Sequence, residues 1–100
     1  MLTLPIKKKW FEMIKSGEKK EEYREIKEYY TSRFGFFDYN DLNMHTSLVA
    51  TYLRFRNGYS KKSPTIECKV SIEKGYGKEE WGAEPNKLYY VLKILSVEEV

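Results

Sequence analysis

The chain has 100 residues, of which 41% are hydrophobic, and a formal net charge of +3, which is too small to identify a nucleic-acid-binding protein by itself. This length is typical of one domain and too short for two, so we expect residues 1–100 to form a single domain around one core. The single cysteine excludes an internal disulfide, and no apolar run reaches the length of a signal-peptide core or a membrane span, so we expect a cytoplasmic protein with no membrane partner.

Two strands and two helices are predicted in the amino-terminal half. Apolar side chains at alternate positions of 2–6 predict a short strand. Over 7–16 the apolar side chains recur at helical spacing, and Gly17 follows where many helices end in the left-handed conformation, so we expect a helix there. Alternation returns over 20–26 and predicts a second strand. A four-residue apolar spacing followed by glycine then predicts a helix over 28–34.

The carboxy-terminal half is predicted to contain three strands. The aromatic and polar segment 36–47 lacks periodicity, which indicates a loop or a lid. The segment 48–55 is apolar on both faces and favours a central strand, whereas 65–73 alternates strictly and predicts a strand with one buried face. A loop rich in Gly and Pro over 75–86 and a buried strand over 88–95 follow. The order of elements predicts an α+β fold.

Positive charge is concentrated in one stretch of the chain. Four basic residues and no acidic residue lie within 51–62, so this stretch has a charge of +4 and the rest has −1, since +3 − 4 = −1. Aromatic residues interleave with these charges, which is typical of surfaces that bind single strands or splayed bases. An ordinary sheet with solvated charges and core aromatics is the alternative. The residues are Arg54, Arg56, Lys61 and Lys62, with Tyr52, Phe55 and Tyr59.

A second polar cluster follows the first predicted helix in the pattern Gly17-x-Lys19-x-x-Glu22-x-Arg24. Glu22 and Arg24 are two apart on a strand and project from one face, where they can orient each other or present an acceptor and donors to a planar ligand. Lys19 lies at the joint of helix and strand. Its ammonium could reach a phosphate or, if desolvated, act as a base or nucleophile. A solvated salt-bridge cluster on an edge strand is the alternative.

This pattern, placed directly after a Gly-terminated helix, resembles the signature of the ASCH family. The order of strand, helix, motif strand and tyrosine-rich closing strand extends the resemblance over most of the chain. The resemblance implies a PUA-like fold, which is a small, mostly antiparallel β-barrel with two or three helices packed on it. It also implies that the motif's polar side chains face a cleft between the helices and the barrel, and that the protein acts near RNA or modified nucleosides.

The first class of function that follows is a binding module with no cofactor. The cleft would receive a flipped base or a phosphate, with RNA or a nucleoside as the partner. The choice between RNA and DNA and the oligomeric state stay open. The ligand-binding residues predicted for this class are Lys19, Glu22, Arg24, Arg54, Arg56, Tyr59 and Trp81.

The second class is a small hydrolase. One branch of the family that resembles this chain removes the acetyl group of N4-acetylcytidine with a lysine, a threonine and a glutamate; Lys19 matches the lysine, and Glu22 stands in the threonine's place. In a hydrolase Lys19 would be base or nucleophile, Glu22 would carry the proton and Arg24 would stabilise the oxyanion. Other family members resemble ribonucleases, for which the same residues could serve. A protein-interaction module is a further alternative, so whether the protein is an enzyme stays open.

Other conspicuous residues favour structural roles. His45 lies in an irregular stretch with Asp38 and Asp41, which is too poorly defined a ligand set, so we expect no metal. Cys68 belongs to the apolar face of its predicted strand, which indicates a place in the core. Trp81 either stacks on a base or closes the barrel end.

Overall fold

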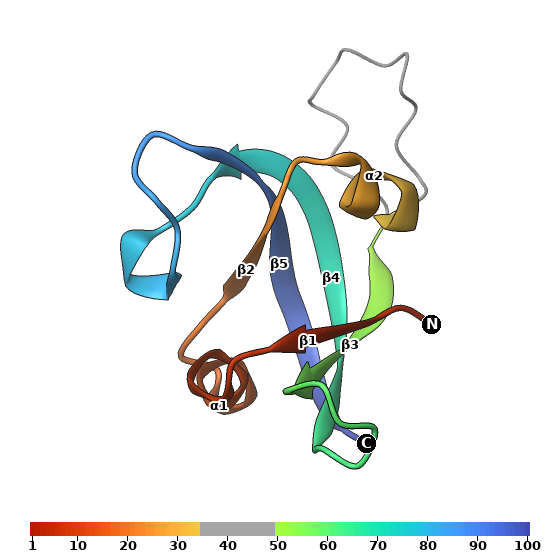
Figure 1. The fold of residues 1–100 in the computed structure, drawn as a ribbon. Coiled ribbons are helices and arrows are strands. Elements are labelled where there is room, and N and C mark those ends of the chain that lie inside the picture. Colours follow the sequence, from red (N-terminus) through yellow and green to blue (C-terminus); the bar gives the residue numbers. More distant parts are fainter. Residues whose placement is uncertain (35–49) are drawn as a thin grey trace.

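Five strands form one mixed sheet that curves into a half barrel (Figure 1). The computed structural model describes residues 1–34 and 50–100. The strands follow the spatial order β1–β3–β4–β5–β2, and two α-helices and a short 3₁₀ helix accompany them. The elements are β1 (Thr3–Ile6), α1 (Lys8–Ser16), β2 (Glu21–Glu25), α2 (Glu28–Phe34), β3 (Thr51–Asn57), β4 (Thr65–Tyr76), η1 (Glu79–Trp81) and β5 (Leu88–Glu99).

The predicted elements of the amino-terminal half are confirmed. β1, α1 and β2 lie within the predicted ranges, and α2 has the predicted bounds. β3 overlaps the predicted strand 48–55 and lies between β1 and β4, so it is an interior strand as expected. The predicted loop 36–47 lies outside the described residues. Among the residues that the structure describes, neither helix has the length and apolarity needed to cross a membrane.

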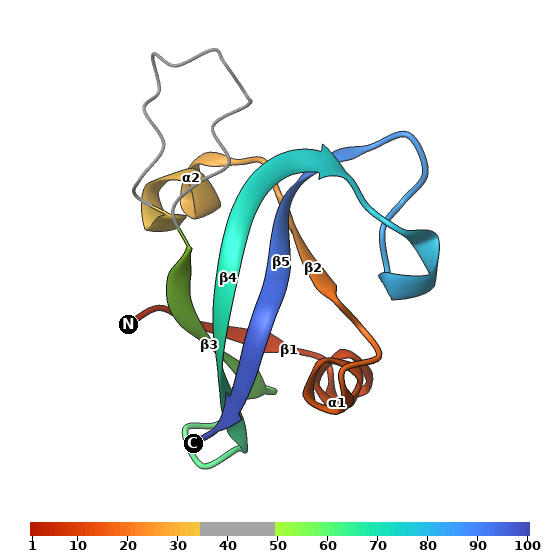
Figure 2. The same ribbon diagram turned by 180° about the vertical axis from the view of Figure 1, so that it is seen from behind.

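β4 and β5 are long, curved strands that form the back of the half barrel (Figure 2). They pair antiparallel over their whole length, with one irregularity of register between Lys69 and Val70. Both strands extend past the predicted ranges 65–73 and 88–95, so the predicted loop 75–86 is shorter than expected. Glycine on its own favours a loop, but Gly75 pairs with Tyr89 of β5. The two strands continue because this pairing provides hydrogen bonds for their backbone N–H and C=O groups.

The sheet is mostly antiparallel, as predicted, since only the pairing of β1 with β3 is parallel. The sequence predicts a barrel, and the part of the chain that the structure describes forms half of one. Within it, the edge strands β1 and β2 are not paired with each other. α1 connects these two edges and lies at the open side between them (Figure 1).

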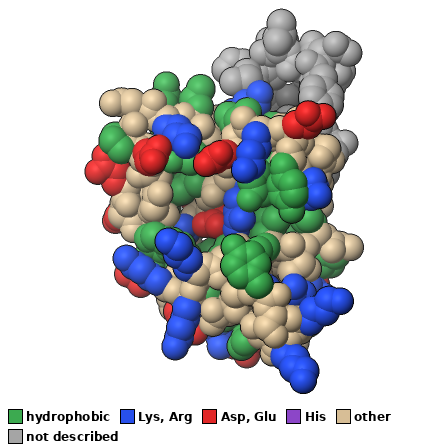
Figure 3. Space-filling model, viewed as in Figure 1, with side chains coloured by type: hydrophobic (Ala, Val, Ile, Leu, Met, Phe, Trp, Pro, Cys, Tyr) green, Lys and Arg blue, Asp and Glu red, His purple; other side chains and the backbone are tan. Residues whose placement is uncertain are grey.

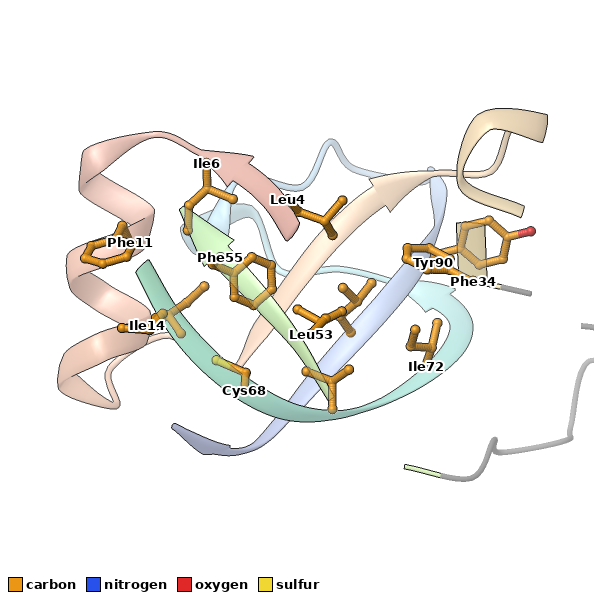
Figure 4. Packing of buried hydrophobic residues seen from close by; sticks show 13 residues of the cluster. Leu4, Ile6, Phe11, Ile14, Phe34, Leu53, Phe55, Cys68, Ile72 and Tyr90 are labelled. Carbon is orange, nitrogen blue, oxygen red and sulfur yellow. The ribbon is translucent and has the colours of Figure 1, made fainter. Parts of the chain in front are cut away.

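A core of hydrophobic side chains fills the concave side of the sheet (Figure 4). Cys68 is fully buried in this core, as predicted, and burial raises the pKa of its thiol to about 12. The helices contribute to the same core. Its members are Leu4, Ile6, Phe11, Ile14, Phe34, Leu53, Phe55, Ile66, Cys68, Val70, Ile72, Tyr90 and Leu92.

A smaller cluster lies where the segment 77–87, which joins β4 to β5, packs against the sheet. Ala83 of this segment contacts buried side chains of β5, and Tyr23 of β2 packs against them. The hydroxyl of Tyr23 also accepts a hydrogen bond from the backbone N–H of Lys78 at 2.9 Å. The segment is therefore attached to β2 and β5 close to the motif.

Candidate functional site

The polar motif begins at the end of α1, where the chain turns into β2. Gly17 ends the helix with a φ of 86°, in the left-handed region that glycine adopts without strain, as predicted. Its N–H donates to the carbonyl of Ile14 at 3.1 Å, and the N–H of Lys19 donates to the carbonyl of Met13 at 2.9 Å. These two bonds fix the backbone of Lys19 against α1.

The ammonium of Lys19 is enclosed, since this residue is only 1% exposed. Its Nζ donates to Oε1 of Glu22 at 2.9 Å and to the backbone carbonyl of Trp81 at 2.7 Å, and lies 4.3 Å from the ring centroid of Trp10. Burial lowers the pKa of Lys19, and the carboxylate of Glu22 opposes that shift. Lys19 therefore joins three elements, because its contacts come from α1, β2 and η1.

Arg24 connects the two edges of the sheet. Its Nη2 donates to Oε2 of Glu22 at 2.9 Å and to the carbonyl of Pro5 on β1 at 3.0 Å, and its Nη1 donates to the hydroxyl of Tyr30 at 3.2 Å. Its Nε is buried and has no hydrogen-bond partner among the residues described. Lys19, Glu22 and Arg24 thus form one continuous chain of charges, with the carboxylate in the middle.

A hollow of about 510 Å³ opens between β1 and β2. Its wall includes Glu22 and Arg24 but not Lys19, which lies behind Glu22. Figure 3 shows this face of the molecule, where charged side chains of both signs and hydrophobic side chains surround a hollow. The aromatic and charged residues that line it are Trp10, Tyr23, Tyr30, Tyr59, Tyr89, Lys7, Lys8, Glu22, Arg24, Glu25, Lys27, Glu84 and Lys87.

The structure brings together only some of the predicted ligand-binding residues. Tyr59 lines the hollow with the motif. Arg54 and Arg56 alternate with core residues of β3 and so project from the opposite face of the sheet, where Arg54 pairs with Glu67 at 3.3 Å. Trp81 contributes its backbone carbonyl to Lys19, and its ring does not line the hollow.

Several residues of the site were not predicted. Trp10 and Tyr30 were assigned only to apolar helix faces, yet both line the hollow and contact the motif. The only available signal was that each lies in the first turn of a helix that flanks the motif strand. Glu84 and Lys87 come from the segment 77–87, whose placement against β2 no local pattern indicates.

Nothing in the described residues indicates a metal centre. No group of three or more His, Cys, Asp or Glu side chains that could hold a metal ion occurs within 1–34 and 50–100. The stretch with His45, Asp38 and Asp41 lies outside the described residues. The chemical groups that line the hollow are carboxylates, ammonium groups, a guanidinium, phenol hydroxyls and aromatic rings.

A scan of protein-family models and searches of curated proteins and of solved structures gave no match to this chain.

Proposed function

We propose that this protein is an ASCH-like domain of PUA-like fold that binds a nucleobase, in RNA or as a modified nucleoside, in the hollow between β1 and β2. The observation that carries the proposal is the Glu22–Arg24 pair in the wall of that hollow. A carboxylate beside a guanidinium offers acceptors and donors to the edge of a planar base. The volume of about 510 Å³ lies within the range of small-molecule sites, roughly 300–1,000 Å³.

The guanidinium of Arg24 has donors left for a ligand. It carries five N–H groups, and the contacts with Glu22, Pro5 and Tyr30 use three of them. One N–H at Nη1 remains, together with the buried N–H at Nε. The Tyr30 hydroxyl accepts from Arg24 and keeps its own proton to donate. These groups would recognise carbonyl and ring-nitrogen acceptors, which bases expose on their edges.

The burial of Lys19 favours binding over hydrolysis. A base or nucleophile has to come within hydrogen-bonding distance of the reacting group. The ammonium of Lys19 contacts Glu22, Trp81 and Trp10, and Lys19 does not line the hollow. Lys19 therefore acts as a positioning residue for the carboxylate, and an amidase or ribonuclease step through it would require these contacts to break.

The test is an NMR titration of the protein with a nucleoside panel that includes N4-acetylcytidine, followed by chromatography of the same mixtures. We expect shifts at Glu22, Arg24 and Tyr30 with the nucleoside unchanged. Arg24→Gln should weaken binding about tenfold or more, the effect of losing hydrogen bonds from a charged donor. Arg54→Gln is the matched control, because Arg54 also pairs with a glutamate but on the opposite face.

Other outcomes would contradict this function. Deacetylated or cleaved product formed by the wild-type protein would establish the hydrolase in its place. No shift with any nucleoside or RNA oligonucleotide would refute the binding of a base and leave the protein-interaction alternative. Equal weakening by Arg24→Gln and Arg54→Gln would show that the hollow is not the binding site.

A further inference from the structure

Tyr59 presents its aromatic ring to solvent at the mouth of the hollow. The residue is 88% exposed and also lines the hollow. The turn that carries it is fixed to the sheet, because the N–H of Gly58 donates to the carbonyl of Ile6 at 3.0 Å and the N–H of Asn57 donates to the carbonyl of Pro64 at 2.9 Å. Gly58 has a φ of 92°, which glycine tolerates. The ring therefore extends from a fixed turn directly beside the proposed base site.

The other rings that line the hollow already have aromatic or cationic neighbours. Trp10 has an ammonium 4.3 Å from its ring centroid, and Tyr30 and Tyr89 pack against other rings at centroid distances of 4.9 and 5.7 Å. Tyr59 has no ring or cation contact within the part of the chain that the structure describes. Its ring, 88% exposed and without such a neighbour among the described residues, is available to stack on a base.

The charges on the two sides of the hollow differ. On the side of β2 and the loop before β5, Lys27 and Lys87 lie 3.9 and 3.8 Å from Glu25, and Lys87 lies 3.5 Å from Glu84. On the side of β1 and the β3–β4 turn, four exposed lysines form no ion pair with any described residue. These unpaired lysines are Lys7, Lys8, Lys61 and Lys62. Figure 3 shows Lys and Arg side chains gathered on the lower half of this face, below the hollow.

We infer that the ligand is a single-stranded nucleic acid rather than a free nucleoside: one base enters the hollow, the next stacks on Tyr59, and the phosphates lie along the unpaired lysines. The inference rests on the proposed function and names its ligand class. A strand supplies bases to a free ring and phosphates to uncompensated cations. A nucleoside has no phosphate and a single base, so it would use neither feature. On the side of β2 the lysines that line the hollow are already paired with Glu25 and Glu84, so the nucleic-acid strand leaves across β1 and the β3–β4 turn.

The test is to measure dissociation constants for a nucleoside, the dinucleoside monophosphate and the pentanucleotide of each base, in RNA and DNA forms. We expect affinity to rise at least about fivefold from nucleoside to dinucleotide, since one stacked base contributes about 1–3 kcal/mol. Tyr59→Ala should remove this gain with length. Tyr76→Ala is the matched control: Tyr76 is 66% exposed but lies at the other end of β4.

The outcomes separate this inference from the proposed function. If nucleosides bind as tightly as oligonucleotides, the single-stranded ligand is refuted and the base site stands. If Tyr59→Ala keeps the gain with length, the stacking of the second base on Tyr59 is refuted. If neither nucleosides nor oligonucleotides bind, the proposed function fails as well. If affinity rises with length for RNA but not for DNA, the single-stranded ligand is supported. The protein would then also recognise the 2′-hydroxyl group of RNA.

Discussion

At the scale of single residues, Lys19 is a structural ion whose loss should destabilise the fold. Replacing it by Met would leave the buried carboxylate of Glu22 with Arg24 as its only charged partner and the Trp81 carbonyl without its donor. Breaking a buried pair typically costs about 3–5 kcal/mol. We expect about 3 kcal/mol for Lys19→Met, because Arg24 remains, measured as the free energy of unfolding in urea by circular dichroism.

The matched control is Lys15→Met, which removes the same type of side chain from an exposed pair. Lys15 lies 2.8 Å from Glu99, but both side chains are largely in water, where ion pairs contribute little. This variant should unfold at nearly the wild-type urea concentration. Equal destabilisation by the two variants would mean that Lys19 is not the enclosed ion described above.

Sequence spacing predicts the side-chain part of this site and misses its backbone part. The two-residue step from Glu22 to Arg24 places both on one face of β2, and their contact at 2.9 Å is what that step implies. The carbonyls of Pro5 and Trp81 lie 19 and 62 residues from the side chains that they bind. Every residue has a carbonyl, so no residue pattern marks these two as partners.

At the scale of elements, the segment 77–87 depends on a close approach at Gly77. A Cβ at this position would lie 2.6 Å from the Cβ of Ala83 and 2.7 Å from two ring carbons of Tyr23, which is well inside van der Waals contact. Gly77→Ala should therefore lower the free energy of unfolding by about 1–3 kcal/mol, the usual cost of overpacking. In Gly75→Ala the nearest atom is 3.6 Å away, so this control should fold normally. Thermal unfolding of both variants checks the difference, and equal melting temperatures would contradict it.

The same segment is attached by Tyr23, whose pKa is raised above its ordinary value of 10.0, chiefly because burial disfavours the phenolate. The folded state holds this proton more tightly than the unfolded chain does. The contribution of Tyr23 to stability is thus complete below pH 10 and is lost as the pH rises above that value. Tyr23→Phe should be less stable by about 1 kcal/mol at neutral pH, the net value of a hydrogen bond.

That deficit should shrink as urea unfolding is repeated between about pH 9 and 11, on either side of the ordinary tyrosine value. Tyr76→Phe, which changes an exposed tyrosine, should leave the dependence of stability on pH as in the wild type. A deficit of Tyr23→Phe that stays constant over this range would show that Tyr23 ionises equally in the folded and unfolded states.

At the scale of the whole molecule, the site lies where the half barrel is open. Local periodicity predicts the strands and helices, because it is a property of neighbouring residues. The order β1–β3–β4–β5–β2 depends on pairings between distant segments, such as β1 with β3, and no local pattern encodes them. Arg24 bridges the two unpaired edges through its side chain. The side chains of Glu22 and Arg24 therefore line the hollow at this edge of the core, next to the unpaired lysines on the side of β1 and the β3–β4 turn.

The location of charge, more than its total, should then govern binding of single strands. Each phosphate neutralised on a single strand contributes about −0.7 to the slope of log affinity against log salt concentration. Lys7→Gln/Lys8→Gln changes two of the unpaired lysines that line the hollow, and it should reduce the magnitude of that slope by up to about 1.4. Lys20→Gln/Lys69→Gln brings the net charge to the same value, since +3 − 2 = +1 in both variants, but changes residues that do not line the hollow. Fluorescence anisotropy of a labelled pentanucleotide at several salt concentrations gives both slopes. If both double variants reduce the slope equally, the strand responds to the overall charge and does not follow the unpaired lysines.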